Sequence, residues 1–242
     1  MIISYAHNFI FIKTRKTAGS SMEIALSSHA GSDDVVTPLG FDQDSQRYQM
    51  YPGLLPQNFS SDKSLEKAFG EAIESGNQRQ MRKIFREQMR SSDLLGARRH
   101  GSATLAREIA GDQFWNSAFK FTVERHPYEK AVSFAWFRAE RNGDFEQALK
   151  EILEIGVYRN FDLYTIDGKK AVDYIIRYEQ FDKDVPQVEE MIGGLPILSR
   201  LARANAHQRK DRRSAREILT AEQKTQIQET CREEFELLGY ER

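Results

Sequence analysis

A short segment near the start of the chain combines small residues, hydroxyl groups and a lysine in a pattern that could bind an anion. It reads Thr14-Arg-Lys-Thr-Ala-Gly-Ser-Ser21. Small side chains let backbone N–H groups approach a phosphate or sulfate, and a following helix adds unpaired donors and partial positive charge. Lys16 supplies a mobile full charge, and Thr17, Ser20 and Ser21 supply hydroxyl donors. The segment is therefore predicted to cradle an anion, although an ordinary polar turn would also fit.

A second segment, Val123-Glu-Arg-His-Pro-Tyr-Glu-Lys-Ala-Val-Ser133, carries an arginine and a serine on either side of a proline. Arg125 closes an expected strand, and Ser133 lies on the helix expected to follow. Pro127 suits the first turn of that helix. Both side chains can then converge at the carboxyl end of the sheet, where α/β folds bind ligands. Arginine offers a fork of donors to a phosphate; a surface arginine and an ordinary helix serine are the alternative interpretation.

Together, the two segments resemble the nucleotide-binding motifs of the sulfotransferase superfamily that uses 3′-phosphoadenosine 5′-phosphosulfate (PAPS), and most closely its carbohydrate sulfotransferase branch. The family pattern is K-T-[AG]-G-[ST]-[ST] after one strand and R-x-P-x-x-[RK]-x-x-S after a later strand. The resemblance implies that the first motif cradles the 5′-phosphosulfate, through Lys16, Thr17, Ala18, Gly19, Ser20 and Ser21. It implies that the second motif holds the 3′-phosphate, through Arg125 and Ser133.

The resemblance extends over most of the chain and is weakest over residues 31–90. Arg99-His-Gly-Ser-Ala103 lies where the family has a histidine-containing segment. Residues 172–181 resemble the family's later strand-to-helix segment, and residues 231–240 resemble its last helix.

Two positions depart from the family pattern. Arg15 replaces the proline that usually precedes the loop lysine, and His126 replaces the Asn or Asp that usually precedes the motif proline. Neither change removes a donor, and Arg15 is counted with the nucleotide-binding loop.

The resemblance implies a transfer of the sulfuryl group from PAPS to an acceptor hydroxyl, releasing adenosine 3′,5′-bisphosphate (PAP) without a metal. Sulfuryl transfer, like phosphoryl transfer, needs positioning and preorganised positive charge. Lys16 is expected to stabilise the leaving oxygen, and His100 is the favoured general base. A helix-capping or exposed histidine is the rival interpretation of His100; Glu23, Glu124 and His29 are weaker candidates for the base.

Basic residues cluster in two further regions. The first group recurs at helical spacing: Arg79, Arg82, Lys83, Arg86 and Arg90. It could receive an anionic acceptor or form a solvated face. The second group includes Arg209 and Arg212, which the resemblance implies lie in a loop over the 3′-phosphate or adenine; a solvated loop is again the alternative. Phe134, Trp136 and Phe137 are expected in the apolar core rather than in a sugar-stacking platform.

Bulk composition narrows the function classes. The 242 residues carry a net charge of −1, so no overall field attracts polyanions, and nucleic acid is not an expected partner. The single cysteine, Cys231, excludes an internal disulfide and is expected to be a small buried residue. The apolar amino terminus precedes its basic residues, unlike a secretory signal, and no apolar run reaches the ~20 residues of a membrane span. A cytoplasmic location is expected.

Apolar and β-branched runs predict strands over residues 8–12, 118–123 and 174–178, and residues 93–97 could form another. Helices are predicted over 62–91 (one or two), 102–110, 127–138, 144–154, 181–192 and 221–238, and one is capped by Ser20 or Ser21. Residues 31–60 are expected to be irregular.

Alternating strands and helices predict a single three-layer α/β domain over residues 1–242. Its central, mainly parallel sheet would be flanked by helices, with a P-loop-like phosphate-binding loop after the first strand.

Two functions from other classes stay open. A kinase-like phosphotransferase would use another phosphate donor. It would need a magnesium-binding aspartate and a triphosphate-binding loop. The sequence has no convincing combination of the two, and the loop motif G-x-x-x-x-G-K-[ST] is absent. A non-enzymatic polyanion-binding domain would use the basic groups. The acceptor is expected to be a saccharide by resemblance, with a lipid, a small metabolite or a protein tyrosine still open.

Overall fold

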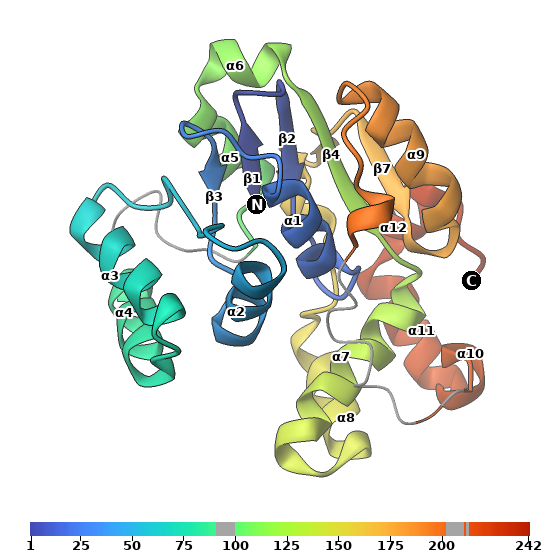
Figure 1. Cartoon of the computed structure of the whole chain (residues 1–242). Coiled ribbons are helices and arrows are strands. Elements are labelled where there is room, and N and C mark those ends of the chain that lie inside the picture. The colour runs from blue at the N-terminus through green and yellow to red at the C-terminus, as the bar shows by residue number, and fades with distance from the viewer. Residues whose placement is uncertain (91–99, 202–210, 212) are drawn as a thin grey trace.

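A five-stranded sheet with the strand order β3-β1-β2-β4-β7 forms the centre of the protein (Figure 1). Its strands are β1 (Ile2–Ser4), β2 (Phe9–Ile12), β3 (Val35–Val36), β4 (Phe119–Glu124) and β7 (Tyr174–Arg177). The structure, a computed structural model, describes residues 1–90, 100–201, 211 and 213–242. The strand suggested at 93–97 lies outside these residues.

The sheet is mixed rather than mainly parallel. Strands β2, β4 and β7 run parallel, whereas β1 pairs antiparallel with both β2 and β3. The prediction is therefore correct for the centre of the sheet and wrong for its β1–β3 side. The sequence pattern also misses β1, which has only three residues, so the candidate anion loop follows the second strand and not the first.

Helices cover both faces of the sheet, as the three-layer prediction requires. Side chains alternate along β2, so Phe9 and Phe11 face one side while Ile10 and Ile12 face the other. The first face packs against α1 (Gly19–Ser27) and α9 (Phe181–Met191), and the second against α5 (Ala103–Ala110) and α6 (Asp112–Ser117). Burying each such side chain contributes about 1.5–3 kcal/mol.

A helical layer lies beyond the carboxyl end of β4 (Figure 1). It consists of α7 (Pro127–Asn142), α8 (Phe145–Ile155), α10 (Ala215–Ile218), α11 (Ala221–Thr230) and α12 (Arg232–Leu238). Pro127 occupies the first turn of α7, as predicted, and the His126 side chain accepts a hydrogen bond from the Tyr128 N–H. The single helix predicted over 221–238 is wrong, because the chain breaks into α11 and α12 at Cys231.

The irregular stretch predicted over residues 31–60 is also wrong in part. It contains β3 and a regular helix, α2 (Phe41–Met50), whose first turn is held by Asp44: its Oδ2 accepts hydrogen bonds from the N–H groups of Leu39 and Gly40. The helices α3 (Lys63–Glu74) and α4 (Gln78–Arg90) follow, as predicted, and lie beyond the β3 edge of the sheet (Figure 1).

Short elements complete the described fold. A hairpin joins β5 (Thr165–Ile166) to β6 (Lys169–Lys170), and single 3₁₀ turns span η1 (Phe161–Leu163), η2 (Tyr178–Gln180) and η3 (Leu198–Arg200). Within the part of the chain that is described, no helix has the length and apolar character needed to cross a bilayer.

Candidate functional site

The loop between β2 and α1 has an unusual backbone. Lys16 and Ala18 both have positive φ angles, 60° and 65°, in the left-handed region that non-glycine residues rarely adopt. Gly19 is required sterically, because a Cβ there would lie 2.7 Å from Lys13 Cγ and 3.2 Å from the Thr14 carbonyl oxygen. The sequence therefore specifies a tight loop that turns directly into the helix.

Helix α1 begins at Gly19, with Ala18 as its cap residue and no side-chain cap. The prediction that Ser20 or Ser21 caps this helix is wrong, since both lie inside its first turn. Since the cap residue offers no side-chain acceptor and no bond from the described residues caps this end, the N–H groups of the first turn suit an external acceptor. An anion is the acceptor that such a helix end favours.

Two threonines brace the loop against β4. The Thr14 hydroxyl donates to the Val123 carbonyl, and the Thr14 and Thr17 Oγ1 atoms lie 2.7 Å apart. Because Thr14 uses its only hydrogen on Val123, the Thr17 hydroxyl is the donor of the second bond. Thr17 is buried, so its hydroxyl acts within the loop.

The Lys16 ammonium lies against two aromatic rings of α7. Its Nζ is 4.4 Å from the Phe137 ring centroid and 5.9 Å from that of Phe134. Burial, followed by the nearby Arg125 charge, lowers the pKa of Lys16 to about 8. Phe134 and Trp136 pack against the apolar core around α7 and α8, as the sequence predicts, and the rings of Phe134 and Phe137 also form the wall against which the lysine packs.

Arg125 directly follows the last residue of β4 and carries a donor without a partner among the described residues. Its Nη2 lies 3.2 Å from Glu129 Oε2, and its guanidinium stacks over the Tyr178 ring at 4.4 Å. The Arg125 Nε is buried and has no hydrogen-bond partner among the described residues. A buried N–H without a partner costs free energy, and an anionic ligand would satisfy it.

The structure brings the two predicted motifs to one side of the molecule. Arg125 is close enough to depress the pKa of Lys16 by repulsion between the two charges. Ser133 lies one helical turn before Phe137 on α7 and therefore shares the helix face that contacts Lys16. The loop with Lys16 and the residue Arg125 thus follow the carboxyl ends of the neighbouring parallel strands β2 and β4, and Ser133 lies on the helix that comes next in the chain.

His100 lies next to the start of the loop. Its Nδ1 is 3.3 Å from the Lys13 carbonyl oxygen, so this nitrogen carries the proton when the ring is neutral. Burial, and then the charges of Lys13 and Arg15, hold the pKa of His100 well below its usual value. The neutral ring keeps Nε2 as a proton acceptor, which is what a general base needs.

The weaker candidates for the base are engaged elsewhere. Glu23 forms a buried ion pair with Lys13 at 2.9 Å, and Glu124 forms one with Lys130 at 2.8 Å. His29 bonds to the Pro196 carbonyl oxygen at 3.1 Å. Each of the three side chains is engaged by another partner, so His100 stays the favoured candidate for the base.

A buried ionic network lies behind the loop, and the sequence gives little sign of it. Lys130 Nζ lies 2.8 Å from Glu124 Oε2 and 2.5 Å from Glu234 Oε2, and all three side chains are fully buried. Burial alone would lower the pKa of Lys130, but the two carboxylates raise it, whereas burial raises the pKa of Glu124 to about 7. Asn160, also buried, connects this network to the loop through Arg15.

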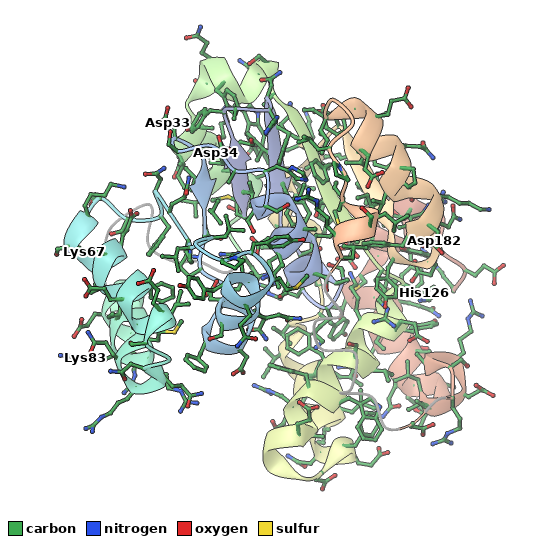
Figure 2. All side chains as sticks on the ribbon, viewed as in Figure 1. Asp33, Asp34, Lys67, Lys83, His126 and Asp182 are labelled. Carbon is green, nitrogen blue, oxygen red and sulfur yellow. The ribbon has the colours of Figure 1, made fainter. Side chains whose placement is uncertain are left out.

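The two predicted basic groups differ in how much of them the structure describes. Arg209 and Arg212 lie outside the described residues. Lys83 of α4 is 77% exposed and pairs with Glu87, and Figure 2 shows it on the outer side of the α3–α4 pair, away from the sheet. The α4 group is therefore remote from the loop.

A hollow of about 630 Å³ opens at the other end of the parallel strands, and Asn8, Phe119 and Asp173 contribute to its lining. These residues lie at the amino ends of the parallel strands, so the hollow is separate from the candidate anion site. The described residues contain no cluster of His, Cys, Asp or Glu suited to holding a metal ion.

Comparison with known proteins gives no match: no family model, curated protein or solved structure is similar to this chain.

Proposed function

We propose that this chain is a sulfotransferase that moves the sulfuryl group of PAPS to an acceptor hydroxyl. The supporting observation is the convergence of two sequence motifs far apart in the chain. The loop with Lys16 follows β2 and Arg125 follows the adjacent parallel strand β4, the Thr14 hydroxyl donates to the Val123 carbonyl, and the Arg125 charge helps to lower the pKa of Lys16. Two repelling cations at one sheet edge favour a ligand with several negative charges.

Each end of the nucleotide has a matching set of donors. The uncapped amino end of α1 and the Lys16 ammonium suit the 5′-phosphosulfate. Arg125, with its unsatisfied buried Nε, and Ser133 suit the 3′-phosphate. Binding would relieve the cost of holding Lys16 charged in a buried position, because an anion replaces the lost hydration.

The proposed reaction assigns one step to each of these groups. The acceptor oxygen attacks sulfur as the bond between sulfur and the leaving phosphate oxygen breaks, so PAP departs with that electron pair. Lys16 stabilises the charge growing on the leaving oxygen. The proton of the acceptor hydroxyl passes to Nε2 of His100, the nitrogen left free by the contact between Nδ1 and the Lys13 carbonyl. A saccharide is the proposed acceptor, on the strength of the motif resemblance.

The direct test is transfer of labelled sulfate from PAPS to a panel of saccharide, lipid, phenol and tyrosine-peptide acceptors. Lys16→Ala is the inactive variant, and Lys83→Ala, an exposed lysine on α4, is the matched control. Thermal shift with PAP and with Mg²⁺–ATP distinguishes donor classes. Stabilisation by ATP alone would favour a phosphotransferase, and binding of any polyanion with steep salt dependence and no effect of Lys16 would favour a binding domain.

A further inference from the structure

Asn160 holds the backbone of the loop at Arg15. Its Oδ1 accepts a hydrogen bond from the Arg15 N–H at 3.0 Å, and its Nδ2 donates to the Arg15 carbonyl at 3.1 Å. The Asn160 side chain is fully buried. One planar amide thus satisfies both backbone polar groups of a single residue, as a neighbouring strand would.

This anchoring matters because the loop conformation is strained. Lys16, the next residue, has a φ of 60°, which costs a non-glycine residue about 1–2 kcal/mol. Arg15 does not restrict the backbone as a proline would. The loop therefore needs an external contact to keep Lys16 in place, and Asn160 provides one on the residue immediately before it.

Asn160 is itself fixed by Glu234 of α12. Glu234 Oε1 accepts hydrogen bonds from the N–H groups of Asn160 at 2.5 Å and Phe161 at 2.9 Å. The other oxygen of the same carboxylate, Oε2, lies 2.5 Å from the Lys130 ammonium. The position of Asn160 is thus set by a buried charge and not by the flexibility of its own loop.

The network continues to the second motif. Lys130 Nζ lies 2.8 Å from Glu124 Oε2, and the same Glu124 oxygen accepts a hydrogen bond from the Arg125 N–H at 2.8 Å. A continuous buried path therefore joins the backbone before Lys16 to the backbone of Arg125. Each link of this path is an ion pair or a hydrogen bond, which restrains the groups it joins, although Glu124 Oε1 has no partner among the described residues.

We propose that Asn160 is a positioning residue that fixes the spacing between Lys16 and Arg125. The site then selects nucleotides phosphorylated at both the 5′ and the 3′ position. This inference rests on the proposed function, because it assumes that the two cations bind the two ends of one nucleotide. If the distance between Lys16 and Arg125 is fixed before binding, a ligand whose two anionic groups match that distance binds more tightly. The reason is that binding then does not have to order the loop.

The test compares Asn160→Ala, Asn160→Asp and Gln57→Ala with the unmodified chain. The aspartate keeps an acceptor for the Arg15 N–H and loses the donor to its carbonyl. Gln57 is a matched control, because its side-chain amide holds a different loop, donating to the Gly31 carbonyl at 2.6 Å and to the Asp34 carbonyl at 3.0 Å. Calorimetry gives the affinities for PAP and for adenosine 5′-monophosphate, and hydrogen exchange reports on the amides of residues 14–18.

In Asn160→Ala, we expect the preference for PAP over the monophosphate to fall roughly tenfold, equivalent to about 1.4 kcal/mol, and exchange at residues 14–18 to accelerate. Asn160→Asp should also lower the preference, because a carboxylate oxygen then faces the Arg15 carbonyl oxygen, and Gln57→Ala should change neither quantity even where it lowers the melting temperature. Unchanged preference and exchange in both Asn160 variants would overturn the inference. If the unmodified chain binds neither nucleotide, the proposed function fails, while the exchange data still decide whether Asn160 holds the loop.

Discussion

The ammonium of Lys16 lies 4.4 Å from the ring centroid of Phe137, one helical turn after Ser133 on α7. The ring helps to keep water from the Lys16 ammonium, and burial is the main reason that the pKa of Lys16 falls to about 8. The lysine is therefore mostly charged at neutral pH and loses its charge in mildly alkaline solution.

The first prediction concerns the alkaline side of the pH profile. If the cationic lysine is required, kcat/KM should fall as pH rises through about 8, because this parameter reports the pKa of groups in the free enzyme. Phe137→Ala should move that fall to higher pH, because the lysine regains hydration. Lys16→Arg should abolish the fall between pH 7 and 10, since arginine stays charged. A profile that is level from pH 7 to 10 in the unmodified chain would contradict the role of Lys16.

The second prediction separates chemistry from binding. Lys16→Ala should lower turnover by about 10²–10³-fold, the usual loss for one donor at a developing negative charge. Its affinity for PAP should fall only modestly, because the amino end of α1 and Arg125 still bind the nucleotide. Lys83→Ala should behave as the unmodified chain does. Equal losses in turnover and in affinity would mean that Lys16 binds the ground state only.

The third prediction concerns His100, whose pKa lies well below 6.5 because of burial and the neighbouring cations. The neutral base then persists as pH falls, so the acid side of the kcat/KM profile should lie at lower pH than that of an exposed histidine. His100→Ala should lower turnover by about 10²–10⁴-fold and remove this acid limb. His29→Ala is the control, because the His29 ring bonds to the Pro196 carbonyl oxygen and not to the loop. An unchanged profile in His100→Ala would exclude it as the base.

How far the sequence predicts the fold depends on how local each signal is. The aromatic and β-branched alternation of 118–123 predicts β4, and Pro127 predicts the start of α7, because each signal acts within a few residues. Strand β1 is missed because three residues hold too little pattern. Helix α2 is missed because its sequence is polar and its first turn is stabilised by Asp44 and not by an apolar face.

The residues of the candidate site also differ in how local their sequence signals are. Lys16 and Arg125 are singled out because each lies in a short motif with a recognisable spacing; the structure places them after the adjacent parallel strands β2 and β4, and their roles stay predictions. Asn160 is missed because its partner, Arg15, lies far away in the sequence, and a single asparagine before a turn carries no distinctive pattern. Contacts between distant segments leave no periodic signal, so the residues that hold a site are harder to predict than those that form it.

The fourth prediction tests the ionic network through stability. Lys130→Met should lower the free energy of unfolding by about 3–5 kcal/mol, because it leaves Glu124 and Glu234 buried without a counter-charge. The pKa of Glu124 is already raised to about 7 by burial, and without Lys130 it should rise further. The unfolded chain ionises this carboxyl near its ordinary pKa of 4.5, whereas the folded variant must keep it protonated or hold an unpaired buried charge, so the loss of stability should be larger at pH 8 than at pH 5. Urea unfolding at both pH values measures this difference.

The restoring variant for that experiment is the double change Lys130→Met and Glu234→Gln. It removes one of the two stranded charges and keeps an amide oxygen for the N–H groups of Asn160 and Phe161. Part of the lost stability should return at pH 8 and little at pH 5. A pH-independent loss in the single variant would show that packing, and not charge, accounts for the effect.

The last prediction concerns the two ends of the nucleotide. Arg125→Ala should weaken PAP binding by about 10- to 100-fold, as expected for one charge-assisted hydrogen bond worth about 1.5–3 kcal/mol. Binding of adenosine 5′-monophosphate should change little, because that ligand has no 3′-phosphate. The comparison controls for the loss of the ion pair with Glu129, since a general disturbance of β4 and α7 would weaken both ligands equally. Equal weakening of the two ligands would therefore place Arg125 outside the 3′-phosphate contact, whereas selective weakening would assign it to that end of the nucleotide.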